Sequence, residues 1–362
     1  MIIAAHIVLA KDSASNYLFT LLCKLAQKHP AYVIHFFMPE TEMPLPALSS
    51  NIQIHFLHTR YQKNGWIGFW YRYRLPGLLK KTEAQIFISD IGRVSVNANI
   101  KQYIFLHAAR PGVPNPLRYT QYPYQQKRNF LLNTRYASAI LSTHPANRKL
   151  FITAQNNKKM LDCLPGLPEA YRPFGWEENQ KTLAAFSKEE GYFLYVVTEN
   201  TQPAMLKMLK AFSIFKKWQK SSMKLLFLLY QVSEREWVPN FDLYKYKNEV
   251  IFQPFTTHEE AAKIFSAAYL QVYYPQEYAD ENFDVMSLQC AVPLIVPERT
   301  YLSDKLLQAA CYTADSAQAL ADRMILLYKD ENLKNGLLTK REEVLKKYHW
   351  PLSLEVLEEL LR

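Results

Sequence analysis

Short apolar runs alternate with amphipathic stretches along most of the chain. In the first half, these runs predict buried strands at 1–10, 32–39, 52–58, 84–90, 101–107 and 138–143. In the second half, they predict strands at 192–197, 224–230, 250–255, 270–275, 293–297 and 310–314, with helices at 202–220 and 257–268. Strands that alternate with helices form parallel sheets, because each crossover returns the chain to the same edge. The pattern therefore predicts an α/β protein with two Rossmann-like parallel sheets.

A proline-rich loop at 163–176 separates the two series of strands. A chain of 362 residues is too long for one ordinary core. We therefore predict a first domain at 1–167, a second at 168–340, and C-terminal helices at 341–362. If two such sheets face each other across a cleft, ligands are expected at the carboxyl ends of the strands that line it.

The cysteines and the apolar segments indicate a soluble cytoplasmic protein. The four cysteines lie far apart in apolar surroundings, which favours buried thiols over disulfides or a zinc site: Cys23, Cys163, Cys290 and Cys311. The first apolar run has no basic segment before it and is too short to span a membrane. We expect no transmembrane helix elsewhere, because no apolar run reaches about 18 residues.

Positive charge gathers in the first half of the chain. Residues 1–170 hold 20 Lys and Arg against 7 Asp and Glu, whereas the remainder holds 23 against 26. The segment 60–81 interleaves six basic residues with Trp, Phe and Tyr. Such a surface suits anionic lipid head groups at the inner membrane face, or an acidic acceptor. It is equally typical of a solvated helix face whose aromatic residues belong to the core. No nucleic-acid-binding motif accompanies it, so we predict no nucleic-acid partner.

The common signatures of dinucleotide, P-loop, zinc-protease and serine-hydrolase sites are absent. The second half instead resembles the C-terminal domain of family 4 glycosyltransferases, in "YFLYVVTENTQPAMLKMLKAFSIFKK", "CAVPLIVPE" and "RMILLYKDENLKN". In the first half, "YIFLHAARPGVPNP" and "ILSTHPANRKLF" are similar to the family's His-Asp strand end and its next helix start. The resemblance implies a GT-B fold, with helices at 341–362 crossing back to the first domain. It also implies retaining transfer of a sugar from a nucleotide-diphosphate donor to a glycan or lipid-linked acceptor, without an obligatory metal.

The donor-phosphate turn of that family is altered in this chain. Val197-Thr198 replaces the family's glycine-containing turn, and Pro203 stands where a lysine is expected. Lys207 or Lys210 could supply the missing charge, although both also suit an ordinary helix surface. Residues 302–308 replace a second glycine-rich turn of the family.

The family's paired donor carboxylates are altered as well. Aligning "LQCAVP" with the family motif places Met286 at the second glutamate and leaves Tyr278 or Ala279 at the first. A shifted register instead pairs Glu281 with Gln289. Either register loses at least one carboxylate of the pair.

The resemblance suggests a small set of site residues. We expect His107 as the catalytic residue, although Ala108 replaces the aspartate that follows it in the family. The remaining candidates are donor-binding Thr198, Glu199, Asp280 and Glu281, and acceptor-side Arg110, Arg118 and Tyr119. For His107 the alternative is a partly buried structural histidine, and for the acids beside 282 it is helix capping.

Two functions fit these residues. The first is a glycosyltransferase of polysaccharide biosynthesis that uses a nucleotide sugar. The second is a catalytically degenerate homologue, acting as a noncatalytic partner or a glycan-binding protein, because a shared fold does not ensure a shared chemistry.

Overall fold

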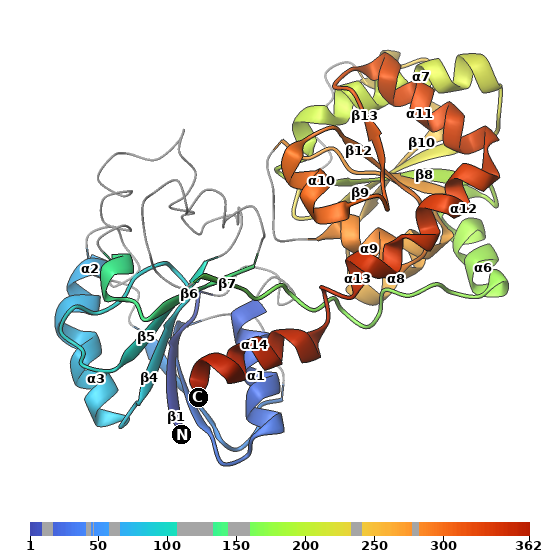
Figure 1. Ribbon diagram of the computed structural model, residues 1–362. Coiled ribbons are helices and arrows are strands. Elements are labelled where there is room, and N and C mark those ends of the chain that lie inside the picture. Colours follow the sequence, from blue (N-terminus) through green and yellow to red (C-terminus); the bar gives the residue numbers. More distant parts are fainter. Residues whose placement is uncertain are drawn as a thin grey trace. The chain divides into compact units, whose positions relative to one another are not determined.

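A computed structural model describes residues 1–8, 17–40, 45, 47–57, 66–106, 133–143, 160–232, 241–276 and 282–362. The chain divides into two compact units (Figure 1). The first unit contains Met1–Gly166 and Tyr348–Arg362, and the second contains Leu167–Lys347. The chain therefore passes from one unit to the other twice.

The first unit is built on a seven-stranded parallel sheet in the order β3-β2-β1-β4-β5-β6-β7. Its strands are β1 (Ile2–His6), β2 (Val33–Pro39), β3 (Ile52–Leu57), β4 (Ile86–Ser89), β5 (Lys101–Leu106), β6 (Ala139–Ser142) and β7 (Met160–Asp162). The six strands predicted in this half are all present. β7 was not predicted, because three residues with an aspartate at the end give no apolar run.

Helices cover both faces of the first sheet. They are α1 (Tyr17–Lys28), α2 (Trp66–Phe69), the π-helical segment η3 (Trp70–Arg74), α3 (Leu75–Lys81) and α14 (Trp350–Leu361). Successive residues of β1 point to opposite faces. Ile3 and Ala5 pack in the core that includes α1 and α14, while Ala4 packs in the core beneath η3 and α3.

The second unit contains a six-stranded parallel sheet in the order β10-β9-β8-β11-β12-β13. Its strands are β8 (Tyr192–Val197), β9 (Lys224–Leu229), β10 (Val250–Pro254), β11 (Leu270–Val272), β12 (Leu294–Pro297) and β13 (Cys311–Thr313). All six were predicted. The two sheets confirm the prediction of two parallel-sheet αβα halves.

The helical segments of the second unit lie before, between and after its strands. They are α6 (Trp176–Ser187), η4 (Gln202–Ala204), α7 (Met205–Gln219), η6 (Phe241–Leu243), η7 (Lys247–Glu249), α8 (His258–Ala267), α9 (Phe283–Gln289), α10 (Thr300–Leu306), α11 (Ala317–Lys329), α12 (Glu331–Thr339) and α13 (Arg341–Leu345). Phe193 of β8 packs against Phe212 and Phe215 of α7, and α11 contributes to the same core. Across the described ranges of both units, no helix is long and apolar enough to cross a membrane.

Helix α14 is fixed to the first unit through several contacts. The Trp350 ring lies against the backbone of Gly166, and the Ser353 hydroxyl donates to the Leu164 carbonyl at 2.6 Å. Near the other end of the helix, the Glu358 carboxylate lies 2.7 Å from Lys28 Nζ and 2.8 Å from His29 Nε2. A helix that follows the whole second unit in sequence is thus part of the first unit's core.

We predict that Gly166→Ala destabilises the first unit. A Cβ at this position would lie 2.4 to 2.6 Å from three atoms of the Trp350 ring, so the helix would have to shift. Overpacking of this kind costs about 1 to 3 kcal/mol, measurable as a lower midpoint in urea or thermal unfolding. Gly77→Ala in α3 is the control, because an added Cβ there has no atom within 4 Å beyond its chain neighbours and the backbone of its own helix. Equal midpoints for Gly166→Ala and the wild type would contradict the packing described.

A second prediction concerns the pH dependence of the α14 contact. The hydrogen bond from Lys28 holds the pKa of Glu358 below its usual value, and His29 adds to this effect. The stabilisation is therefore present above the unfolded pKa of about 4.3 and is lost as the pH falls through the lowered folded pKa. We expect Glu358→Gln to cost roughly 0.5 to 1 kcal/mol at pH 7 in urea unfolding. The difference from wild type should shrink as the pH falls below about 4.3 and vanish once the pH lies below the lowered folded pKa of Glu358. A difference independent of pH would refute the assignment.

Candidate functional site

The second sheet has its topological switch point between β8 and β11. From β8 the chain continues to β9 on one side, whereas β11 lies on the other side. In open parallel sheets, ligands bind at the carboxyl ends of the strands beside such a reversal. The candidate site therefore includes the segments that follow β8, β11, β12 and β13.

The loop after β8 is held by its own threonines. The Thr198 hydroxyl accepts hydrogen bonds from the amides of Asn200 and Thr201 at 3.2 and 3.3 Å. The Thr201 hydroxyl accepts from the Thr198 amide at 2.8 Å and donates to the Val196 carbonyl at 2.7 Å. Three amides that could face a phosphate are thus engaged within the loop. Thr198 itself is buried, while Glu199 is exposed.

The loops after β8 and β11 are joined directly. The Gln276 amide donates to both the backbone carbonyl and the side-chain oxygen of Asn200, each at 3.1 Å. The carbonyl of Gln276 in turn accepts from Arg299 Nη1 at 2.7 Å. These contacts connect the ends of three strands, β8, β11 and β12, at the switch point.

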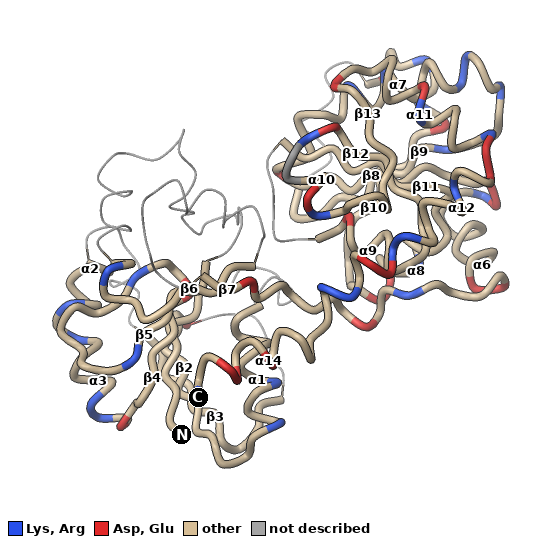
Figure 2. The backbone as a smooth tube through the Cα atoms, in the orientation of Figure 1, with Lys and Arg blue, Asp and Glu red and all other residues tan. Residues whose placement is uncertain are grey.

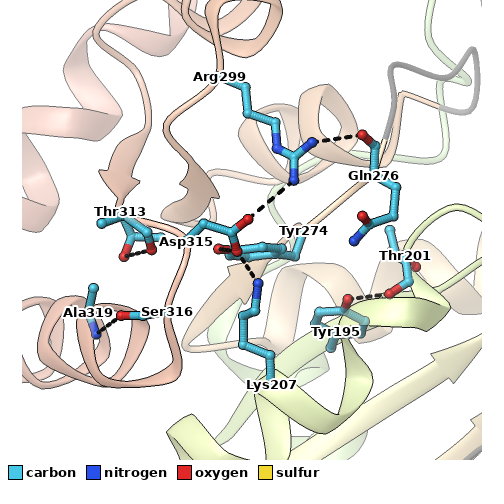
Figure 3. Close-up of polar contacts among 11 residues, drawn as sticks. Tyr195, Thr201, Lys207, Tyr274, Gln276, Arg299, Thr313, Asp315, Ser316 and Ala319 are labelled. Atoms are coloured by element: carbon cyan, nitrogen blue, oxygen red, sulfur yellow. Dashed lines mark hydrogen bonds and ion pairs between the residues drawn. The ribbon is translucent and has the colours of Figure 1, made fainter.

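Two cations converge on one carboxylate at the same edge of the sheet (Figure 3). Lys207 of α7 forms an ion pair with Asp315, which follows β13. The Arg299 guanidinium lies 3.7 Å from the other carboxylate oxygen, and the Tyr274 hydroxyl donates to Asp315 at 2.6 Å. Lys207 Nζ also lies 4.4 Å from the centre of the Tyr274 ring.

The electrostatics of this group follow from its contacts. The hydrogen bond from Lys207, with that from Tyr274, holds the pKa of Asp315 below its usual value. Burial raises the pKa of Tyr274, and the neighbouring carboxylate raises it further. At neutral pH the group therefore contains two positive charges, one negative charge and a neutral phenol. We name Lys207, Tyr274, Arg299 and Asp315 the cation cluster.

Helix α9 carries Met286, at the position where the resemblance to family 4 glycosyltransferases implies a glutamate. Met286 is buried in this helix, so the apolar side chain belongs to the core. Two residues earlier, Asp284 is fully buried and its Oδ1 atom lies 2.8 Å from Lys305 Nζ of α10. Residues 302–306 of the segment that replaces a glycine-rich turn of that family lie in α10, whose Lys305 anchors α9.

Several predicted site residues lie outside the residues that the structure describes. They are His107, Arg110, Arg118, Tyr119, Asp280 and Glu281, and their roles stay predictions. Of the cation cluster, only Lys207 was predicted from the sequence as a possible phosphate ligand; Tyr274, Arg299 and Asp315 were not. A signal for these three existed, because Arg299 and Asp315 follow predicted strands by two residues and one residue, and Tyr274 lies near the end of another. The contacts among them could not be predicted from the sequence, because these contacts depend on the order of strands in the sheet.

No metal site is evident in the described parts of the chain. These parts contain no group of three or more His, Cys, Asp or Glu side chains that could hold an ion. The four cysteines are free thiols; Cys163, Cys290 and Cys311 are buried, and Cys23 is half-buried.

No protein-family model and no curated protein matches this sequence. Solved structures do match it. Sucrose-phosphate synthase from Thermosynechococcus elongatus is 14% identical with a TM-score of 0.74, over 100% of this chain and 98% of that one. WaaG, a glycosyltransferase involved in lipopolysaccharide biosynthesis, is 9% identical with a TM-score of 0.71, over 98% and 99%. Anabaena HepE in complex with UDP-glucose is 12% identical with a TM-score of 0.71, over 99% of each chain. These glycosyltransferase structures confirm the GT-B fold predicted from the sequence.

We predict that the buried ion pair beside the candidate site is required for stability. Asp284→Asn would remove the carboxylate that pairs with the buried Lys305 ammonium, and the loss of a buried ion pair should cost about 3 to 5 kcal/mol in urea unfolding. The control is Glu331→Gln, which removes an exposed carboxylate from its pair with Lys334 and should cost less than about 0.5 kcal/mol. Similar losses for the two variants would show that burial of the Asp284 pair has no energetic consequence.

Proposed function

We propose that this protein is a glycosyltransferase that transfers a sugar from a nucleotide-diphosphate donor to a glycan or lipid-linked acceptor, with retention of configuration. The cation cluster is the observation that carries the proposal. Two positive side chains, Lys207 and Arg299, converge at the switch point of a GT-B sheet. This edge is where parallel sheets bind their ligands.

The chemistry of sugar transfer explains why such cations matter. A leaving nucleotide diphosphate develops negative charge, and fixed positive groups stabilise that charge most when they are already in place. The loop after β8 offers little help, because its threonines engage three of its amides. We therefore assign the role of the missing phosphate-binding lysine to Lys207, with Arg299 as the second cation. This arrangement needs no obligatory metal.

Asp315 has a defined part in the proposal. It is an anion held between the same two cations, and its side chain is 59% exposed to solvent. A diphosphate carries more negative charge than a carboxylate, so it would compete for Lys207 and Arg299. Donor binding would then displace Asp315 from one or both of its ion pairs.

The acceptor side of the proposal rests on the sequence. His107 is the proposed catalytic residue, and Arg110, Arg118 and Tyr119 are the proposed acceptor contacts. A role in polysaccharide biosynthesis is supported by the structural similarity to WaaG, a glycosyltransferase involved in lipopolysaccharide biosynthesis. A lipid-linked acceptor would place the protein in the cytoplasm at the inner membrane face, with contact through residues 60–81.

The central prediction is that nucleotide diphosphates bind through the cation cluster. Titration of UDP and GDP by calorimetry measures their dissociation constants. A nucleotide present at ten times its dissociation constant should also raise the free energy of unfolding by about 1.4 kcal/mol. Lys207→Ala and Arg299→Ala should each weaken binding at least about tenfold, since each removes a hydrogen bond to a charged group. Asp315→Asn should strengthen binding, because it removes the competing carboxylate.

Lys210→Ala is the matched control for this experiment. Lys210 is an exposed lysine of the same helix, one turn from Lys207, and should have no effect on binding. Equal losses of nucleotide affinity for the Lys207 and Lys210 variants would show that the cation cluster does not bind the donor. Failure of every nucleotide diphosphate to bind would overturn the enzyme assignment and leave the degenerate homologue.

A further inference from the structure

The helical run Trp66–Lys81 presents an aromatic ridge to solvent. Trp66, Phe69 and Tyr73 are 53%, 44% and 58% exposed. Their rings are in contact, with centroids 6.0 Å apart between Trp66 and Phe69 and 4.9 Å apart between Phe69 and Tyr73. Neighbouring exposed aromatic rings are unusual on a soluble surface and mark an interaction site. Trp66, Phe69 and Tyr73 are therefore surface residues, although the sequence also allowed them to belong to the core.

The same run is strongly basic. Four exposed cations lie along it and none of its residues is acidic; the cations are Arg72, Arg74, Lys80 and Lys81. The Arg72 guanidinium lies 5.6 Å from the centre of the Tyr73 ring, so charge and aromatic surface are interleaved. In Figure 2, blue segments recur along the run from α2 to α3. We name these four cations and three aromatic residues the basic aromatic surface.

The opposite side of the run holds it in place without help from the exposed rings. Trp70, Tyr71 and Leu75 are buried against the first sheet. The Tyr71 hydroxyl lies 2.7 Å from His6 Nδ1 and 2.9 Å from Ser89 Oγ, at the ends of β1 and β4. Burial lowers the pKa of His6 to about 4, so this anchor stays uncharged at neutral pH. The outer face is thus presented on a rigid support.

We propose that the basic aromatic surface binds the head-group region of an anionic lipid bilayer. Tryptophan and tyrosine rings favour the membrane interface, where one part of the ring is apolar and another is hydrated. Lysine and arginine beside them are attracted to the negative surface potential of anionic lipids. The ridge lies along one helical run, which fits a broad planar partner. The biological role of this surface rests on the proposed function, because a lipid-linked acceptor would lie at a membrane. Vesicle binding and nucleotide binding are measured separately, so either can fail without the other.

The experiment is co-sedimentation of the full chain with vesicles. We expect binding to vesicles of phosphatidylcholine with roughly one third phosphatidylglycerol, and little binding to phosphatidylcholine alone. Neutralising the four cations (R72Q, R74Q, K80Q and K81Q together) should lower the partition coefficient at least about tenfold. Replacing the rings (Trp66→Ser, Phe69→Ser and Tyr73→Ser together) should also weaken binding. Raising the salt concentration should weaken wild-type binding, because exposed charges are screened.

A matched variant tests whether vesicle binding depends on the basic aromatic surface or only on the net charge of the protein. Lys188, Lys210, Lys217 and Lys220 are four exposed lysines of the second unit, and their replacement by glutamine should leave vesicle binding unchanged. Equal loss in this variant would refute the proposal, as would equal binding to both kinds of vesicle. All variants should keep the wild-type unfolding midpoint and UDP affinity. If the four-cation variant lost binding to a random RNA oligonucleotide but retained vesicle binding, the surface would be a nucleic-acid site instead.

Discussion

Parallel strand pairing is the constraint on which the candidate site depends. Each crossover returns the chain to the same edge of the sheet, so the carboxyl ends of all the strands gather there. Residues that lie far apart in sequence, such as Lys207, Tyr274 and Asp315, are therefore brought into contact. The reversal of strand order between β8 and β11 places this group where open parallel sheets bind their ligands. The cation cluster is a product of topology more than of any local motif.

The second unit has this topology, although its local chemistry differs from what the resemblance to family 4 glycosyltransferases implies. Backbone amides that could hold a phosphate are engaged by Thr198 and Thr201, and a buried methionine stands where a glutamate is expected. The buried pair of Asp284 and Lys305 joins α9 to α10. Because these backbone amides are engaged, a phosphate at this edge would have to be bound by charged side chains such as Lys207 and Arg299. Long cationic side chains impose a less exact geometry than a backbone cradle.

Much of the fold could be predicted from the sequence, because buried parallel strands leave long apolar runs. Twelve of the thirteen described strands coincide with such runs, and only the three-residue β7 was missed. The site was less accessible. Periodicity places Lys207 on an exposed helix face, and nothing local distinguishes it from Lys210. Its partner Asp315 lies 108 residues further along the chain, so the pairing follows from strand order, which hydrophobic pattern does not encode. The sequence also did not decide whether Trp66 and Phe69 are exposed, because aromatic residues interleaved with basic ones suit either a surface or a core.

The position of α14 has a consequence for how the protein is made. This helix supplies Leu354 and Leu357 to the first unit's core, yet it leaves the ribosome only after the entire second unit. Domains usually fold in the order of their synthesis. Here the unit that is begun first would be completed last, and α1 would expose an uncovered apolar face while some 180 residues of the second unit are translated. During that interval the nascent first unit would be the part of the chain that most needs protection by a chaperone.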